Sequence, residues 1–120
     1  MAKSKSSAPR ARNSAADRRS CAPIFAALGD ETRLGLVAKL SGVHACSISQ
    51  LTRGTQLTRQ AVTKHLRVLM NAGIVKNVKS GRESLFELDT TPLREVRDYV
   101  EIVSSRWDAE VGRAKADRRR

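Results

Sequence analysis

The stretch LTRQAVTKHLRVLMNAG, residues 57–73, decides the fold of this chain. Its apolar residues Val62, Leu66 and Leu69 recur at spacings of four and three, which is the periodicity of a helix that buries one face. Thr58 is a suitable N-cap, and the Asn-Ala-Gly sequence at 71–73 is typical of a helix end. The opposite side of this predicted helix carries only polar residues and no acid: Arg59, Gln60, Thr63, Lys64 and Arg67.

The residues just before this stretch predict a shorter helix. Ser47 or Ser49 can begin it, Ile48 and Leu51 provide its apolar positions, and the polar loop 53–56 follows. Two helices joined in this way form a helix-turn-helix pattern.

Two strands are expected directly after the pair, at 74–79 and 83–88, with the Gly-containing loop 80–82 between them. A hairpin in this position is a wing. The predicted fold class is therefore mainly α with a small β-hairpin, a winged helix-turn-helix.

Three further helices are expected around this unit. Residues 23–28 form a short apolar stretch closed by Gly29, and Asp30 is a suitable N-cap for a helix that ends at 41–42. The last helix runs from Pro92 onwards, and its apolar residues recur at three, four, three and four: Leu93, Val96, Val100, Val103 and Trp107. Such a seam can cover the core of its own domain or join two chains.

The charges of the chain are segregated. No acidic residue lies between Glu31 and Glu83, whereas the same stretch holds nine basic ones: Arg33, Lys39, Arg53, Arg59, Lys64, Arg67, Lys76, Lys79 and Arg82. A surface of one sign favours a polyanion, because each cation that neutralises a phosphate releases a condensed counterion. Nucleic acid is the partner that this pattern indicates.

Much of the remaining charge lies in the two ends. Residues 1–21 hold six basic residues and one acid, and residues 113–120 hold five and one, so the net charge of +11 leaves only +2 for the body. We expect a disordered basic tail at 1–21, a DNA-binding and dimerisation domain at 22–112, and a basic C-terminal tail at 113–120.

Alone, the polar stripe of residues 59–67 is typical of an ordinary solvated helix face. The neighbouring short helix and hairpin instead favour a helix that reads DNA. Arg can pair with guanine, Gln with adenine, and Thr with a base edge or a thymine methyl, while Lys64 and Arg67 suit phosphates. The predicted DNA-binding residues are Thr58, Arg59, Gln60, Thr63, Lys64, Arg67 and, from the wing, Lys79 and Arg82.

Two runs carry a resemblance to a known family: LGDETRL at 28–34 and LTRQAVTKHLRVL at 57–69, followed by AGIV at 72–75, GR at 81–82 and LFEL at 85–88. Together they resemble the ArsR-type (arsenical-repressor) family of winged-helix regulators, over roughly residues 22 to 110. The resemblance implies a homodimeric repressor that binds an imperfect palindrome in double-stranded DNA and leaves it on an unidentified signal. It also implies a dimer interface in the first and last helices: Ile24, Phe25, Leu93, Val96, Val100, Val103 and Trp107.

The metal site of some family members is not expected here. The paired cysteines of those members fall on Ser47 and Ser49, whose hydroxyls are poor ligands for soft metals. His44 and Cys46 would need a three-residue shift to take their place. Thiol sensing by Cys21 and Cys46 is the next possibility, and the others are an organic effector bound between subunits or no effector.

Other functional classes fit the residues less well. The sequence has no Gly-rich phosphate loop, no nucleophile elbow and no carboxylate cluster outside the last helix, so it does not suggest an enzyme, and no cofactor is expected. A sequence-tolerant architectural DNA-binding protein and a winged-helix protein-interaction module are the alternatives. Without a signal peptide or an apolar membrane span, the chain is expected to be cytoplasmic.

Overall fold

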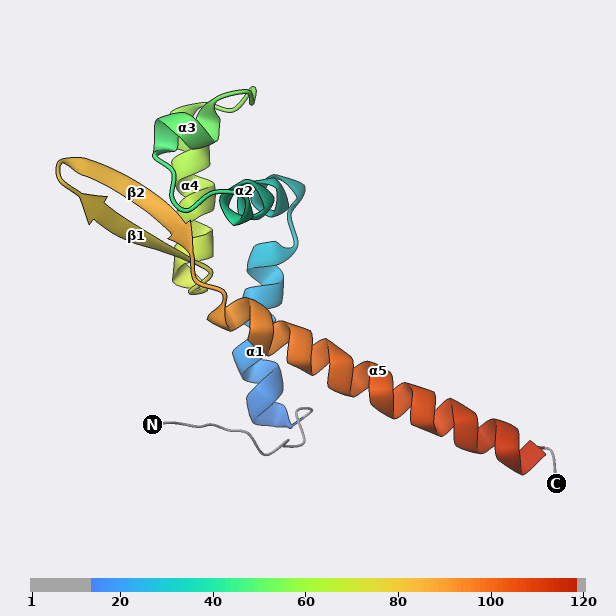
Figure 1. Ribbon diagram of the computed structural model, residues 1–120. Coiled ribbons are helices and arrows are strands. Elements are labelled where there is room, and N and C mark those ends of the chain that lie inside the picture. The colour runs from blue at the N-terminus through green and yellow to red at the C-terminus, as the bar shows by residue number, and fades with distance from the viewer. Residues whose placement is uncertain (1–13, 119–120) are drawn as a thin grey trace.

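The structure, a computed structural model, describes residues 14–118. The elements follow in the order α1 (Ala15–Leu28), α2 (Glu31–Ser41), α3 (Ile48–Thr52), α4 (Arg59–Asn71), β1 (Val75–Ser80), β2 (Glu83–Leu88) and α5 (Thr91–Arg118). Figure 1 shows α1 to α4 gathered into one body, with the hairpin projecting on one side and α5 running far out on the other. The predicted winged helix-turn-helix is confirmed.

The helix-turn-helix forms because side chains cap both of its helices. Ser47, rather than Ser49, precedes α3, and its hydroxyl accepts the Gln50 N–H while the Gln50 side chain accepts the Ser47 N–H. The Thr58 hydroxyl accepts the Ala61 N–H at the start of α4. Such caps satisfy backbone donors that have no partner inside the helix.

The end of α4 is fixed by Gly73. This glycine has a φ of +79°, and the Ile74 N–H donates to the Leu69 carbonyl while the Gly73 N–H donates to the Met70 carbonyl. That pair of bonds ends a helix in the Schellman manner and turns the chain into β1.

The wing is a two-stranded antiparallel hairpin with Ser80 opposite Glu83, so only Gly81 and Arg82 lie in its turn. Its second strand agrees with the sequence prediction, and its first begins and ends one residue later than predicted. One contact was not predicted: Cys46, just before α3, exchanges both backbone hydrogen bonds with Phe86 of β2. This bridge ties the base of the wing to the helix-turn-helix.

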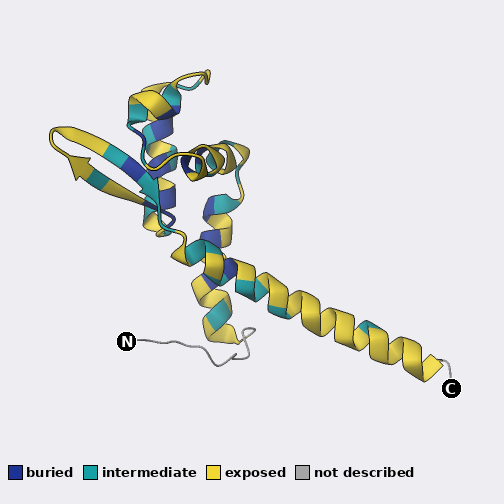
Figure 2. Ribbon diagram, in the orientation of Figure 1, coloured by how far each residue is buried: buried dark blue, intermediate teal, exposed yellow. Residues whose placement is uncertain are grey.

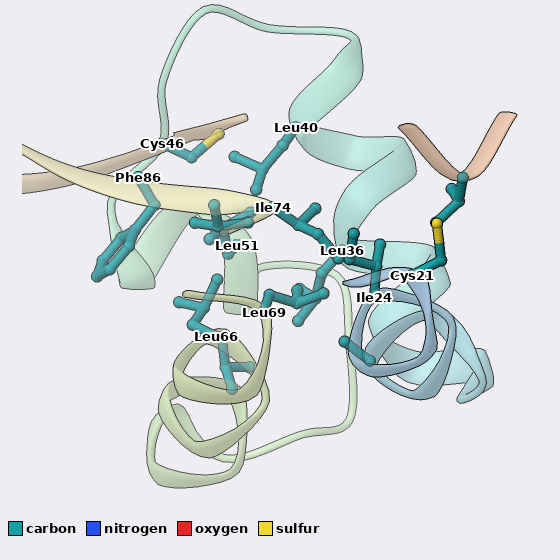
Figure 3. Close-up of a cluster of buried hydrophobic side chains, with 14 residues drawn as sticks. Cys21, Ile24, Leu36, Leu40, Cys46, Leu51, Leu66, Leu69, Ile74 and Phe86 are labelled. Atoms are coloured by element: carbon teal, nitrogen blue, oxygen red, sulfur yellow. The ribbon is translucent and has the colours of Figure 1, made fainter. Parts of the chain in front are cut away.

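The core lies where α1, α2, α3, α4 and the base of the wing meet (Figure 3). Five of its side chains have no exposed surface: Leu51, Val62, Leu66, Leu69 and Ile74. Figure 2 shows the buried residues in these elements and along the first part of α5, whereas the rest of α5 is mostly exposed. No helix within residues 14–118 is long and apolar enough to cross a membrane.

The first and last helices extend further than expected. Helix α1 begins at Ala15 rather than near Pro23, because Ser14 and Asp17 form a capping box that starts the helix earlier. Residues 15–21, assigned to the disordered tail, are therefore helical in the structure. Helix α5 likewise continues to Arg118 through most of the expected C-terminal tail. The other expected tail residues, 1–13 and 119–120, lie outside the described part of the chain.

Two glycines should respond to alanine with opposite signs. A Cβ at Gly73 would require a strained left-handed conformation and would lie 3.4 Å from Pro92 Cγ, so Gly73→Ala should destabilise the fold by about 1–2 kcal/mol. Gly35 lies inside α2 with open space where a Cβ would be added, so Gly35→Ala should stabilise by about 0.5–1 kcal/mol. Urea unfolding of both variants measures the two changes, and equal signs would contradict this account.

Candidate nucleic-acid interface

The burial of one side of α4 leaves its polar stripe in solvent. Arg59, Gln60, Lys64 and Arg67 are all exposed. Within residues 14–118, the structure shows no hydrogen bond or ion pair made by these four side chains. Their donors are therefore available to an external acceptor. The structure thus brings the predicted contact residues of α4 together on one face.

The two threonines of this predicted set also have internal roles. The Thr58 hydroxyl caps α4 and can still donate its own proton. The Thr63 hydroxyl donates to the Arg59 carbonyl at 2.8 Å, so toward an external partner it can only accept a hydrogen bond or present its methyl group. Thr63 is half-buried, in contrast to the four longer side chains.

The wing residues lie apart from the stripe. Lys79 and Arg82 are exposed near the tip of the hairpin, which Figure 1 shows projecting away from the helices. The base of the wing is less basic than its sequence suggests, because Lys76 Nζ lies 3.5 Å from Glu87 Oε1. The available cations of the wing are therefore at its tip.

Two of the nine basic residues, Lys39 and Arg33, bind backbone carbonyls within the described chain. Lys39 Nζ donates to the carbonyls of Leu51 and Arg53 at 3.3 and 2.8 Å, at the C-terminal end of α3. Arg33 binds the C-terminal end of α1 in a similar way. Cations at such ends satisfy free carbonyls and offset the negative end of the helix dipole. The order of charges along the sequence could not separate these cations, which bind backbone carbonyls, from those with no partner in the described chain.

Arg33 also reaches α4. Its Nε donates to the Ala27 carbonyl at 2.7 Å, and its Nη1 lies 3.2 Å from Nδ1 of His65 in α4. Asp30 completes the group, since its carboxylate accepts the Arg33 N–H at 3.0 Å and lies 3.9 Å from the His65 ring. The predicted cap at Asp30 is confirmed, whereas the connection between Arg33 and His65 was not predicted.

The pKa of Asp30 is held below its ordinary value. The main cause is the hydrogen bond from the Arg33 backbone N–H, and the positive charge of the Arg33 side chain acts in the same direction. The carboxylate is therefore favoured in its charged form, which is the form that caps α2.

The two cysteines are not brought together. Neither forms a disulfide and both are buried. Figure 3 places Cys21 of α1 and Cys46, beside Phe86, at opposite ends of the core cluster. The structure thus shows no dithiol pair in the described chain.

The positions of the family's metal ligands are used for other purposes. Ser47 caps α3, and Ser49 is exposed within it. His44 is almost fully exposed and lies 3.7 Å from Glu87, while Cys46 is buried. Among residues 14–118, no three His, Cys, Asp or Glu side chains are grouped closely enough to hold a metal ion.

The residues predicted for a dimer interface divide into two sets. Ile24 and Val96 are buried in the core of the single chain, and Leu93 is partly buried against it. Phe25, Val100, Val103 and Trp107 are 38–69% exposed, and the Phe25 ring contacts Tyr99 edge-on at 6.2 Å between centroids. The exposed set forms an apolar strip over α1 and α5.

Comparisons with known proteins agree with this geometry. Residues 30–77 match the family described as bacterial regulatory protein, arsR family. An uncharacterised HTH-type transcriptional regulator of Bacillus subtilis, YuzN, is 35% identical over 77 residues, which cover 59% of this chain and 84% of that protein. The HTH-type transcriptional regulator Rv2034 of Mycobacterium tuberculosis is 35% identical over 72 residues, covering 59% of this chain and 65% of that protein.

A solved structure extends the similarity to the whole fold. An ArsR-like transcriptional regulator from Rhodococcus sp. RHA1 superposes with a TM-score of 0.76 and 32% sequence identity. The match covers 84% of this chain and 94% of that one. These similar proteins are transcriptional regulators and not enzymes.

The depressed pKa of Asp30 makes part of the stability depend on pH. Because the folded pKa lies below the unfolded one, this contribution is complete above about pH 4 and is lost as the pH falls through the folded value. Asp30→Asn keeps a good N-cap but removes the charge. The variant should lose less unfolding free energy than the wild type between pH 7 and pH 3 in urea titrations. Superimposable pH profiles would show that Asp30 carries no such linkage.

Proposed function

Because this chain belongs to the arsR family of bacterial regulatory proteins and is a transcriptional regulator, we propose that it acts as a homodimeric repressor on an imperfect palindromic operator. The observation that carries the proposal is the exposed, acid-free face of α4, whose long polar side chains make no bonds within the described chain. This face stands beside the short helix α3 and the hairpin wing, the arrangement in which a polar helix face is used to read DNA. Binding of this kind takes place in the cytoplasm, where bacterial DNA lies.

In this proposal α4 enters the major groove. Arg59 and Gln60 lie in its first turn, where recognition helices contact base edges, while Lys64 and Arg67 follow on the same side and suit phosphates. Thr63 offers its methyl group to a thymine. Lys79 and Arg82 at the wing tip contact the backbone or the minor groove beside it.

The exposed apolar strip supports dimerisation. Val100, Val103 and Trp107 follow one another along one side of α5, and Trp107 is 69% exposed in the single chain. Large apolar side chains in a row are costly in water, and a second copy of the same strip would cover them. A twofold axis there would present two α4 helices to successive major grooves, about 34 Å apart.

In this proposal, release from DNA does not depend on a metal bound by paired cysteines, as it does in some members of the family. Ser47 and Ser49 occupy those positions, and Ser47 is committed to the cap of α3. The proposed regulator therefore responds to another effector, or to changes in its own concentration.

Selection of bound sequences from random duplex DNA at about 150 mM salt tests the proposal, because salt suppresses the electrostatic share of binding. We expect an enriched palindrome whose half-sites are about one helical turn apart. Gln60→Ala should relax the preference at one base of each half-site and cost about 1–3 kcal/mol, whereas Lys64→Ala should weaken all sequences alike and lower the salt slope by about one.

Three results would count against this account. Binding without enrichment would indicate an architectural DNA-binding protein, and no binding would indicate a protein-interaction module. Equal losses on operator and random DNA for Gln60→Ala would remove its assigned role in base recognition.

The dimer interface has its own test. Replacing Val100 and Val103 together by Asp would bury carboxylates in the proposed interface, so dimer dissociation should become at least about a hundredfold more favourable. Ser105→Asp, on the other side of the same helix, is the matched control and should leave the dimer intact. Sedimentation velocity measures both, and a double variant that stays dimeric would place the interface elsewhere.

A further inference from the structure

One side chain connects three helices of this chain. Arg33 lies in the first turn of α2, donates to the carbonyls of Ala26 and Ala27 at the end of α1, and contacts His65 in the middle of α4. Its backbone N–H is held by Asp30, whose carboxylate also approaches the His65 ring. The Arg33 side chain is half-buried, which restricts its conformations and keeps its three polar contacts in place.

The contact with Arg33 favours one tautomer of His65. A guanidinium can only donate, so Nδ1 of His65, at 3.2 Å, must be the acceptor and the ring proton must lie on Nε2. The same Nδ1 cannot then donate to Asp30, whose oxygen is 3.9 Å away and beyond hydrogen-bond distance. The bond to Arg33 is therefore the directional interaction of this ring.

The core contacts between α1 and α4 are apolar. Ile24 and Ala27 of α1 belong to the same core cluster as Leu69 of α4. Apolar burial is not directional, so it holds the helices together without specifying their angle as sharply as a charge-assisted hydrogen bond does. Arg33 can fix the angle between α1 and α4, because it is hydrogen-bonded to the end of α1 and to the middle of α4.

We propose that the pair Arg33 and His65 is a positioning device that fixes α4 relative to α1 and thereby sets the half-site spacing that the dimer accepts. This inference rests on the proposed function, in which α1 and α5 form the dimer and α4 reads DNA. Its basis is the set of three polar contacts of Arg33, two with carbonyls at the end of α1 and one with Nδ1 of His65.

The lengths involved make the effect large enough to measure. Helix α4 has 13 residues and is about 20 Å long. A tilt of roughly 10° about one end of the helix displaces the other end by about 3.4 Å, which is close to one base-pair step. In a twofold dimer both recognition helices would shift. A protein that cannot hold this angle should accept several spacings, whereas a protein that holds it should accept one.

The test measures binding to duplexes that carry the palindrome selected by the wild type, with the spacer shortened or lengthened by one or two base pairs, and to a duplex with a single half-site. His65→Leu removes the acceptor but leaves Arg33 bound to α1, and His65→Gln restores an acceptor. His44→Leu makes the same chemical change at the only other histidine, which lies outside this junction and is not part of the proposed interface. Thermal unfolding confirms that each variant is folded.

We expect the wild type and His44→Leu to lose about tenfold or more in affinity when the spacer changes by one base pair, on the scale of a mismatched site. His65→Leu should reduce that discrimination to about threefold or less, because one charge-assisted hydrogen bond is lost, while single half-site binding changes by no more than about twofold. His65→Gln should recover the wild-type profile. In the wild type, the imidazole nitrogen shifts in NMR spectra should show the Nε2–H tautomer.

The failures are distinguishable. If the wild type selects no palindrome, the proposed function fails and this inference fails with it. If the wild type prefers one spacing and His65→Leu keeps the same preference, only the positioning role is overturned. If His65→Leu weakens a single half-site as much as the palindrome, His65 acts within α4 alone, which also overturns the inference.

Discussion

The burial of a single helix stripe is the constraint on which the rest of the structure depends. Val62, Leu66 and Leu69 of α4 have no exposed surface, and they meet Leu51 of α3 and Ile74 at the start of the wing. Burying side chains of this kind contributes roughly 1.5–3 kcal/mol each, which outweighs any preference of the opposite face. When that stripe is buried, the opposite face of α4 must point into solvent. This face carries Arg59, Gln60, Lys64 and Arg67. The core thus determines the orientation of the candidate interface.

Lys and Arg side chains have two distinct uses in this small domain. On α4 and at the wing tip they extend into water, where they are available to phosphates and bases. On α2 they bind backbone carbonyls of neighbouring helices: Lys39 at the end of α3, and Arg33 at the end of α1. Helix ends inside a small body must have their carbonyls satisfied, and a long cationic side chain does this while keeping its charge partly solvated. α2 therefore serves as a connector between the helices on its two sides.

Much of the fold could be predicted from the sequence because the decisive interactions are local. The caps at Asp30 and Thr58, the helix end at Gly73 and the second strand depend on neighbours within a few residues. The prediction failed where distant or competing contacts decide. Pro23 suggested a helix start, but the Ser14–Asp17 capping box begins α1 eight residues earlier. The Cys46–Phe86 bridge and the Arg33–His65 contact join residues far apart in the chain, and no periodicity indicates them. The face of α4 was predictable, whereas the means of holding it in place was not.

The distribution of exposed apolar residues leaves part of the apolar face of α5 in water in the single chain. Val96 of α5 is buried in the core of the chain. The apolar residues that follow it on the same helix, Val100, Val103 and Trp107, are exposed, because little of the described chain packs against this part of α5. A domain of this size has a small hydrophobic core, so apolar side chains exposed on α5 lower its stability. Association that buries them would remove this free-energy cost. Association by that seam would also carry α1 into the interface, since Phe25 of α1 contacts Tyr99 of α5. Arg33 donates a hydrogen bond to a carbonyl at the end of the same helix, α1. In the proposed dimer, a partner would also fix the position of α1, to which the Arg33 junction is attached. Dimerisation and DNA recognition by α4 would then depend on one packing arrangement.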